Sequence, residues 1–385
     1  MQRSSCRGDP WLVRIGIDTR LMYYQRAGIA SYVAGLLQGI ATVGSRHEFV
    51  VFPSRKDRQA SHLPSRFNRH PLWTPPHHRF ERLALAIELA PVRLDILHSP
   101  DFIPPMRILS SRRSVITVHD LAFLKYPEVL TPESKRYYGY IGPAVEQADA
   151  VIAVSENTKR DLMALLDTPE EKIFVIPEAA DLAYRPSNDQ PRVKRTLERY
   201  GIRHPYFLFV GTIEPKKNLK TLFQAFADFR KLVSSSSVLP DLVIVGRKGW
   251  LYADILKVVD QLDIARYVHF LGRIDQDDLV SLYNGALALT YPSLYEGFGL
   301  PALEAMQAGT PVITSNISSL PEVVGDAGIT VDPRDPEAIT QALTRVWSSP
   351  DLRADLRRRG LARAAQFTRE QMARATLEVY DRLAR

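Results

Sequence analysis

The sequence predicts an α/β protein built as two Rossmann-like, doubly wound parallel sheets that face a central cleft. Short runs rich in Val, Ile and Leu alternate with helical stretches along the chain, which is the pattern of parallel strands joined by crossover helices. These runs form two similar sets, one in each half of the chain. The chain also has 385 residues, more than a single hydrophobic core usually supports. Two domains are therefore expected.

The expected strands follow in order along the chain. In the first half they are residues 13–17, 49–52, 96–98, 115–119, 150–154 and 173–176. In the second half they are residues 206–210, 242–245, 268–271, 286–291, 312–314 and 329–331. The polar segment RPSNDQ, residues 185–190, separates the two sets and is the expected linker.

The chain then divides into three expected parts. Residues 1–185 are expected to form an N-terminal domain, and residues 191–366 a C-terminal domain. Residues 367–385 have helical spacing and are expected to form a helix that packs back toward the N-terminal domain. Thr368 is the expected N-cap of this helix, and its apolar contacts are Met372, Ala375, Leu377 and Tyr380.

The composition indicates an ordinary globular protein. Hydrophobic residues make up 45% and charged residues 24%, as in ordinary globular proteins. No apolar run approaches the roughly 20 residues that span a bilayer, and the N-terminus lacks the apolar core of a signal peptide. A cytoplasmic protein is expected. The lone cysteine, Cys6, cannot form an intrachain disulfide.

The formal net charge of +7 favours anionic partners. Between residues 55 and 82, Asp57 and Glu81 face an excess of basic residues: Arg55, Lys56, Arg58, Arg66, Arg69, Arg79 and Arg82. Such a bias suits a peripheral contact with the anionic inner face of a membrane or a phosphorylated acceptor, and equally a solvated face of loops. Nucleic acid is not expected as a partner, because no aromatic-interleaved basic motif accompanies the charge.

The strongest motif is YPSLYEGFGLPALEAMQAGTPVITS, residues 291–315. A strand ends, Gly297 and Gly299 follow, and a helix is expected to begin near Leu300 with Pro301 in its first turn. The unpaired N–H groups of such a helix start bind phosphate, and glycines let the backbone approach it. Two carboxylates, Glu296 and Glu304, stand seven intervening residues apart in this segment.

Other polar residues follow expected strands. GTIEPKKN begins at Gly211 and carries Lys217, a cation able to stabilise a leaving diphosphate. TVHDLAF contains His119 and Asp120, and QRAGIASYV contains Gly28 at a helix start. Later loops carry three more basic residues and a neighbouring backbone position: Arg247, Lys248, Arg273 and Ile274. Ligands bind beyond the carboxyl ends of parallel strands, where these residues lie.

Together with VSENTKRDL and SSLPEVVGDAG, these segments resemble family 4 of the retaining glycosyltransferases, which have the GT-B fold. The resemblance runs through nearly the whole chain after Val13 and is densest from residue 211 to 332. The combination of EPKKN with YPSLYEGFGLP is similar to the mannosyltransferase-like branch of that family.

The resemblance implies that residues 1–185 bind the acceptor and residues 191–366 bind the nucleotide sugar. It also implies a role for each carboxylate and cation. Glu304 would accept hydrogen bonds from the donor ribose, and Lys217 would contact the diphosphate. Glu296 would hold hydroxyls of the donor sugar with the N–H groups of Phe298, Gly299 and Leu300. The family's usual arginine position is occupied by Thr212, so Lys216 or Arg247 is left as the second cation.

The remaining positions take supporting roles in the same resemblance. His119 would face the donor sugar, orient it and stabilise positive charge at the anomeric carbon, while Asp120 would orient the loop or the acceptor. Lys248 would reach the phosphates, and the backbone of Arg273 and Ile274 would flank the base. The loop before Gly28 would close over the donor diphosphate.

The expected activity is metal-independent, retaining transfer of a hexose from a nucleotide diphosphate sugar, with no cofactor. GDP-mannose is the first expected donor and UDP-glucose or another UDP-hexose the alternative; the acceptor is a glycan, a lipid-linked glycan or a small molecule. A nucleotide-sugar-binding subunit without catalysis remains an alternative. A hydrolase needs carboxylates on opposite sides of a glycosidic bond, which Glu296 and Glu304 do not suit. A dehydrogenase is disfavoured because Gly-x-Gly-x-x-Gly follows neither first strand.

Overall fold

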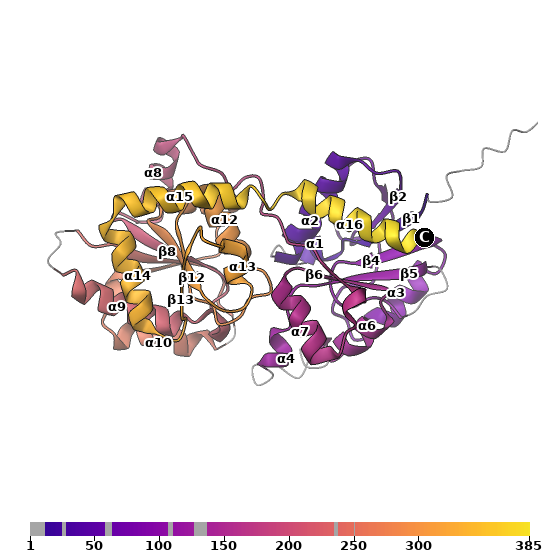
Figure 1. The fold of residues 1–385 in the computed structure, drawn as a ribbon, viewed down its shortest axis with the longest axis horizontal. Coiled ribbons are helices and arrows are strands. Elements are labelled where there is room, and N and C mark those ends of the chain that lie inside the picture. The colour runs from indigo at the N-terminus through magenta and orange to yellow at the C-terminus, as the bar shows by residue number, and fades with distance from the viewer. Residues whose placement is uncertain are drawn as a thin grey trace, which may run out of the picture. The chain divides into compact units, whose positions relative to one another are not determined.

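The computed structural model describes residues 12–24, 28–57, 64–106, 111–126, 137–234, 238–249 and 251–385. Cys6 and Arg58 lie outside these residues. Contacts divide the chain into two compact units, drawn in Figure 1. Unit 1 comprises Met1–Ala179 with Thr368–Arg385, and unit 2 comprises Ala180–Phe367. No helix in the described ranges is both long and apolar enough to cross a bilayer.

Unit 1 contains a parallel sheet whose described strands run in the order β3-β2-β1-β4-β5-β6-β7. Their bounds are β1 Arg14–Asp18, β2 Glu48–Phe52, β3 Asn68–Arg69, β4 Leu94–Ser99, β5 Ser111–Val118, β6 Ala150–Ala153 and β7 Ile173–Val175. Six of these strands coincide with the expected ones. β3 was not predicted, because it consists of two exposed polar residues at the sheet edge and has no apolar run.

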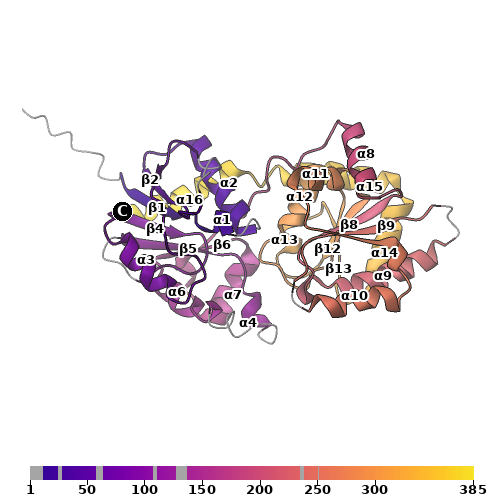
Figure 2. The same ribbon diagram turned by 180° about the vertical axis from the view of Figure 1, so that it is seen from behind.

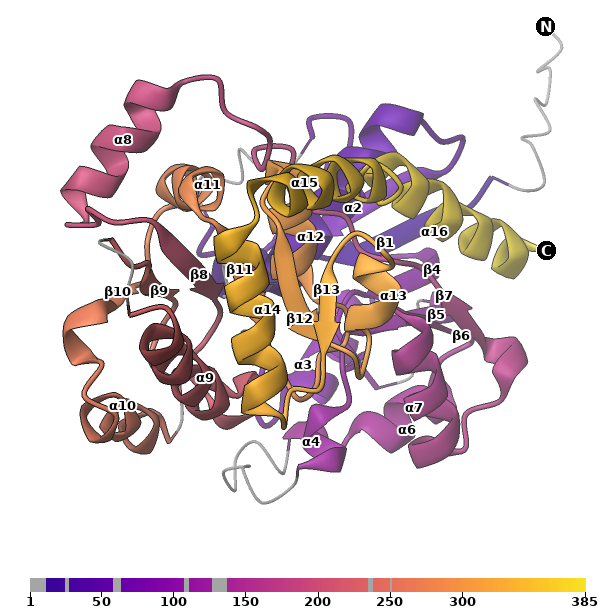
Figure 3. The same ribbon diagram turned by 60° about the vertical axis from the view of Figure 1, so that its left-hand side comes forward.

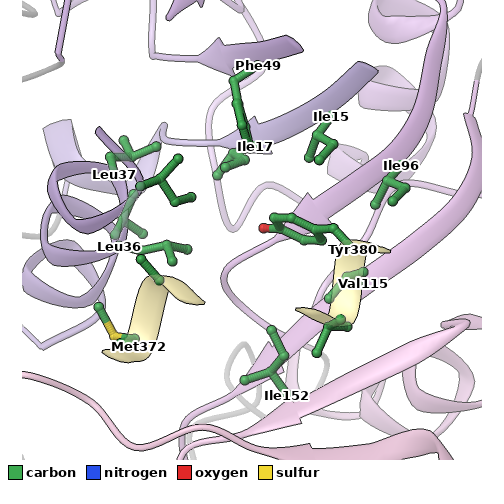
Figure 4. Close-up of a cluster of buried hydrophobic side chains, with 14 of the residues drawn as sticks. Ile15, Ile17, Leu36, Leu37, Phe49, Ile96, Val115, Ile152, Met372 and Tyr380 are labelled. Carbon is green, nitrogen blue, oxygen red and sulfur yellow. The ribbon is translucent and has the colours of Figure 1, made fainter. Parts of the chain in front are cut away.

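Helices cover both faces of this sheet, as Figure 2 shows from the other side. The described helices of unit 1 are α1 Leu21–Tyr24, α2 Gly28–Val43, α3 Glu81–Leu89, α4 Ala122–Lys125, α6 Ile141–Gln147, α7 Glu156–Leu166 and α16 Arg369–Ala384, with a short 3-10 turn at Glu170–Lys172. An extended apolar cluster lies between α2, α16 and the sheet. In Figure 4, Met372 and Tyr380 from α16 lie among side chains such as Leu36 of α2 and Ile15 of β1.

The C-terminal helix α16 belongs to unit 1, where it runs along α2. Its start is set by a capping box, in which Thr368 accepts from the N–H of Gln371 and the Gln371 side chain reaches back. α2 and α16 approach so closely that a Cβ at Gly39 would lie 2.2 Å from the Arg369 carbonyl oxygen. A glycine inside a helix is disfavoured by itself, so this close approach explains its presence.

Unit 2 contains a second parallel sheet, whose described strands run in the order β10-β9-β8-β11-β12-β13. Their bounds are β8 Tyr206–Val210, β9 Asp241–Val245, β10 Val268–Gly272, β11 Ala288–Tyr291, β12 Val312–Ser315 and β13 Ile329–Val331. All six were expected from the sequence. Two Rossmann-like parallel sheets, one in each unit, confirm the predicted fold class.

The helices of unit 2 pack in pairs against its sheet, with α9 beside α14 and α12 beside α15 (Figure 3). The described helices are α8 Gln190–Arg199, α9 Leu219–Leu232, α10 Tyr252–Gln261, α11 Gln276–Gly285, α12 Leu300–Ala308, α13 Leu320–Val324, α14 Pro336–Ser348 and α15 Pro350–Ala364, with 3-10 turns at Pro215–Lys217 and Ala265–Tyr267. Side chains of Asp335 and Ser349 cap α14 and α15 at their N-termini.

The segment predicted as a linker is attached to unit 2. The side chain of Asn284 accepts from the N–H of Ser187 at 2.7 Å and donates to the carbonyl of Arg185 at 3.0 Å. Unit 2 accordingly begins at Ala180, earlier than the polar composition of residues 185–190 indicates. The segment lies against α11, and the contacts to Asn284 are made by its backbone and not by its polar side chains.

The order of the strands indicates where each unit can bind a ligand. In both sheets the order reverses beside the first strand, between β1 and β4 in unit 1 and between β8 and β11 in unit 2. Ligands of such sheets bind at this reversal, beyond the carboxyl ends of the strands. The loops after β8 and β11 carry Lys217 and Glu296, and the loop after β5 carries His119.

A buried polar chain links α16 to the sheet of unit 1. His98 on β4 lies 2.5 Å from the Tyr380 hydroxyl and 2.9 Å from Thr117 Oγ1, which in turn lies 3.1 Å from the Tyr32 hydroxyl. Burial, reinforced by the charge of His119, lowers the pKa of His98 to about 3, so this ring is neutral at ordinary pH. A neutral ring donates through one nitrogen and accepts through the other, and both partners are present.

We expect Tyr380→Phe to lower the free energy of unfolding by about 1–3 kcal/mol, because it leaves a buried nitrogen of His98 without a partner. Urea unfolding measures the change. Tyr23→Phe in the same unit is the control, since that ring is exposed. Equal urea midpoints for Tyr380→Phe and the parent would show that the polar chain does not stabilise unit 1.

Candidate active site

The loops after β8 and β9 lie backbone against backbone. A Cβ at Gly246 would lie 1.8 Å from the carbonyl oxygen of Gly211, so only glycine fits there. Ile213 forms a parallel bridge with Lys248, and its N–H donates to the carbonyl of Arg247. This arrangement holds the start of the GTIEPKKN segment against the end of β9, while the side chains of Arg247 and Lys248 are exposed.

Asn218 connects the loop after β8 to the loops after β11 and β13 through hydrogen bonds. Its backbone is left-handed, with φ of 59°, a conformation that Asn tolerates better than most residues. Its side-chain amide donates to the carbonyl oxygens of Pro292 at 3.1 Å and Pro333 at 2.6 Å. The carbonyl of Lys216 accepts from the N–H of Leu294 at 2.8 Å. The loops that follow β8 and β11 are therefore held together on both sides of Lys217.

Lys217 and Glu296 form a buried ion pair at the strand-order reversal. The Lys217 ammonium lies 2.5 Å from Glu296 Oε1 and 2.8 Å from the Tyr291 hydroxyl. Burial alone raises the pKa of Glu296, but the charges of Lys217 and Lys216 outweigh it, and the pKa lies below its ordinary value. Glu296 is thus an anion, and two of the three ammonium protons of Lys217 have partners in the protein.

Two serines of the SSLPEVV segment, residues 318–324, donate hydrogen bonds to the glycine loop, residues 296–299, that precedes α12. Ser318 Oγ donates to the carbonyl of Glu296 at 2.6 Å, and Ser319 Oγ donates to the carbonyl of Phe298 at 2.7 Å. Gly299 has φ of 110°, and a Cβ there would lie 2.7 Å from a methyl carbon of Leu320. Glycine is therefore required at this N-cap for both backbone conformation and space.

The N-terminus of α12 presents a row of backbone donors. The N–H groups of Phe298, Gly299 and Leu300 make no hydrogen bond to a residue within the described ranges. Gly297 is buried beside them, and Pro301 occupies the first turn, where a missing N–H costs nothing. These donors lie next in sequence to Glu296, at the helix start that the sequence predicts.

Glu304 lies one turn further along α12. Its Oε2 accepts from the Tyr283 hydroxyl at 2.9 Å. Burial, followed by the charge of Glu304, raises the pKa of both Tyr283 and Tyr184, so both phenols remain protonated donors. These tyrosines were not predicted as site residues. Tyr283 is a buried residue of helix α11, and its sequence position resembles that of a core residue.

His119 and Asp120 lie at the carboxyl end of β5 in unit 1. The ring of His119 has partners at both nitrogens: Nδ1 lies 2.7 Å from Glu178 Oε1 and Nε2 lies 2.9 Å from the carbonyl oxygen of Pro100. Asp120 Oδ1 accepts from the N–H of Ala122 at 3.1 Å, a contact that orients the loop entering α4. Glu178, after β7, is a partner of His119 that the sequence pattern does not indicate.

The remaining predicted residues flank these groups. Gly28 is the exposed first residue of α2, and residues 25–27 before it lie outside the described ranges. Arg273 is exposed and Ile274 partly buried after β10, whose last residue, Gly272, accepts from the N–H of Gly246 at 2.8 Å. Unit 2 therefore groups Gly211, Lys216, Lys217, the backbone at Arg247 and Lys248, and residues 296–304, whereas Gly28, His119 and Asp120 belong to unit 1.

Comparison with known proteins decides the family. Residues 197–363 match the family model described as Glycosyl transferases group 1, and residues 26–184 match that described as Glycosyltransferase Family 4. Over 388 aligned residues the chain is 30% identical to O-antigen chain mannosyltransferase B of Escherichia coli, covering 96% of this chain and 100% of that protein. The chain belongs to the GT-B glycosyltransferases.

Solved structures of low identity share the fold of this glycosyltransferase. Sucrose-phosphate synthase from Thermosynechococcus elongatus has a TM-score of 0.75 at 22% identity, covering 96% of this chain and 98% of that chain. The structure of Anabaena HepE in complex with UDP and glucose has a TM-score of 0.73 at 17% identity, covering 95% and 99% of the two chains. A further curated relative, serotype-specific mannosyltransferase WbdA of Escherichia coli, is 27% identical over 70% of this glycosyltransferase and 34% of its own length.

The buried ion pair gives a prediction about stability. Lys217→Met leaves the Glu296 carboxylate buried without its cation, so we expect a loss of about 3–5 kcal/mol in the free energy of unfolding. The double variant Lys217→Met/Glu296→Gln removes both charges and should recover most of that loss. Urea unfolding at neutral pH compares the two, and a double variant no more stable than Lys217→Met would contradict the pairing.

Proposed function

We propose that this glycosyltransferase is a retaining, family 4 enzyme that transfers mannose from GDP-mannose. The observation that carries the proposal is the buried pair of Lys217 and Glu296 beside the backbone N–H groups that start α12, which have no acceptor among the described residues. A cation and a row of N–H groups suit a diphosphate, and an ionised carboxylate suits sugar hydroxyls. Transferases whose names specify mannose, among them the Escherichia coli relative at 30% identity, support mannose as the sugar.

Transfer then proceeds on one face of the sugar. The bond between the anomeric carbon and the diphosphate oxygen breaks, and the acceptor oxygen bonds to the same face of that carbon. The acceptor proton passes to the leaving diphosphate, which departs as nucleoside diphosphate. Lys217 and the α12 N–H groups bind this diphosphate more strongly as its negative charge develops, which lowers the barrier.

The second donor candidate is a UDP-hexose. It is favoured by the likeness of fold to Anabaena HepE, whose structure holds UDP and glucose, although at 17% identity this likeness concerns the fold alone. A glycan acceptor is supported by the relatives named for the O-antigen chain. Release of free nucleoside diphosphate from the donor distinguishes an enzyme from a binding subunit without catalysis.

A thermal-shift series tests the donor assignment. We expect GDP-mannose to raise the melting temperature more than UDP-glucose, UDP-GlcNAc or ADP-glucose, because a ligand that binds the native state stabilises it by mass action. Glu304→Ala should abolish most of the shift, since it removes the proposed ribose acceptor. Glu322→Ala, on α13 of the same unit, is the control. A shift by UDP-glucose alone would replace GDP-mannose as the donor.

Metal independence forms part of the proposal. Within the described ranges, no group of three or more His, Cys, Asp or Glu side chains is placed to hold a metal ion. The diphosphate charge would be met by Lys217 and the helix start. We expect EDTA to leave the rate of donor consumption unchanged. A rate that falls with EDTA and returns only with Mg²⁺ or Mn²⁺ would contradict this.

We also propose that unit 1 contacts an anionic bilayer through the solvent side of α3. Leu85 and Leu89 face the core, whereas Leu83 and Ile87 are exposed on the other side, with Phe80 one turn before them. Trp73 is 72% exposed and lies beside α3, because its N–H donates to Glu88 at 2.6 Å. Exposed apolar side chains of this size favour a partner.

The charges beside these side chains favour lipid over a second copy of the chain. The guanidinium of Arg55 lies 3.3 Å above the Trp73 ring, and that of Arg79 lies 4.4 Å from the Phe80 ring. The two carboxylates of α3 are both engaged: Glu81 is buried and paired with Arg20, and Glu88 accepts from the N–H groups of Trp73 and Thr74. Two such surfaces would repel, whereas anionic headgroups attract arginines and admit apolar side chains.

Vesicle sedimentation tests this contact. We expect the protein to sediment with vesicles containing phosphatidylglycerol and to remain in solution with phosphatidylcholine alone. Leu83→Ser/Ile87→Ser should release it, whereas Leu182→Ser/Leu232→Ser, in which both leucines are exposed on unit 2, should not. Equal sedimentation of the two double variants, or a dimer in solution that α3 substitutions dissociate, would contradict the proposal.

A further inference from the structure

The proton arrangement of His119 is restricted by its two partners. Nε2 faces the carbonyl oxygen of Pro100, which accepts but cannot donate, so Nε2 carries a proton. Nδ1 lies 2.7 Å from Glu178 Oε1, at a distance that requires one proton between them. The pair is therefore either an imidazolium with a carboxylate or a neutral imidazole that accepts from a carboxylic acid.

The charges around the ring favour the imidazolium. Burial lowers the pKa of His119, but the hydrogen bond and charge of Glu178, the Pro100 carbonyl and the charge of Asp101 outweigh it, so the pKa is raised. Asp101 is itself an anion, because hydrogen bonds from His77 and Tyr137 lower its pKa against the effect of burial.

The other titratable neighbours add no opposing charge. His98 on β4 is neutral, since burial and the charge of His119 hold its pKa near 3. The ring of Tyr32 on α2 meets the His119 ring edge to face at 4.9 Å, and burial raises the pKa of this phenol. The ring of His119 thus faces anions and neutral groups.

We propose that Glu178 is a positioning residue that fixes the ring of His119 and keeps it a cation for the sugar transfer. This inference rests on the proposed function. A cation repels positive charge, so His119 would not stabilise an electron-poor anomeric carbon, the role expected from the sequence. The imidazolium, with its two N–H groups bound to Glu178 and Pro100, instead offers a fixed positive ring to an electron-rich substrate atom at the carboxyl end of β5.

The sign of the pH dependence follows from the raised pKa. The cation is complete below the ordinary His pKa of about 6.5 and is lost as the pH rises through the higher value in the folded protein. The rate of transfer should therefore fall on the alkaline side. Glu178→Gln keeps the size and an acceptor oxygen but removes the charge, so this alkaline fall should move to lower pH by on the order of one unit or more.

Two readouts test the inference on the full-length chain. NMR of protein labelled at histidine, with His119 assigned by His119→Gln, follows the ring titration without activity. Donor consumption against pH then gives kcat and KM. In Glu178→Gln we expect the His119 titration and the alkaline limb of kcat to move together, with KM for the donor little changed. Glu178→Asp, which keeps the charge on a shorter side chain, should restore part of kcat.

Glu171→Gln is the matched control, because this exposed carboxylate precedes β7 and should shift neither readout. An unchanged His119 titration in Glu178→Gln would overturn the pairing. A shifted titration with an unmoved alkaline limb would overturn the role in transfer. If the parent releases no nucleotide from any donor, the proposed function fails, while the NMR titration still decides whether Glu178 sets the charge of His119.

Discussion

The architecture of unit 2 depends on one buried ion pair between two loops that are distant in sequence. Lys217 follows β8 and Glu296 follows β11, the two strands between which the order of the sheet reverses. A buried charge without a partner is costly, so each side chain requires the other. The pair thereby fixes the relative position of the only two loops in unit 2 that start at the reversal, within the described residues.

Hydrogen bonds from uncharged side chains hold in place the two loops that carry the ion pair. Asn218 holds the loop after β8 to Pro292, and Ser318 holds the backbone of Glu296 from the opposite side. The N-terminus of α12 is positioned by the same contacts, because Gly299 packs directly on Leu320. A preorganised set of cation, carboxylate and N–H donors needs little rearrangement when a charged ligand binds, which is the condition for strong electrostatic stabilisation.

Much of the fold could be predicted from the sequence, because buried parallel strands are nearly continuous apolar runs. β3 could not, since its two polar residues bury nothing, and the attachment of residues 185–190 to Asn284 depends on a contact across about 100 residues. The candidate site residues were predicted from their places after strands. Their partners were not: Lys217 and Glu296 were assigned to different parts of the donor, although they bind each other.

His119 shows the same limit. Its place after β5 is evident from the sequence, but its charge depends on Glu178, 59 residues later, and on a backbone carbonyl. Local patterns predict which residues reach the edge of a sheet, because strand periodicity and chain direction set that edge. They do not predict which side chains meet there, because this depends on the lengths and conformations of loops from different strands.

The most direct test of the account is the single-turnover rate of Lys217→Ala at saturating donor, with Lys217→Arg and the exposed Lys257→Ala beside it. If the ammonium stabilises the leaving diphosphate in the transition state, Lys217→Ala should lose on the order of 10²-fold or more in rate. Lys217→Arg keeps a misplaced charge and should retain part of the rate, and Lys257→Ala should match the parent. A folded Lys217→Ala enzyme that transfers sugar at close to the parent rate would show that the diphosphate binds elsewhere.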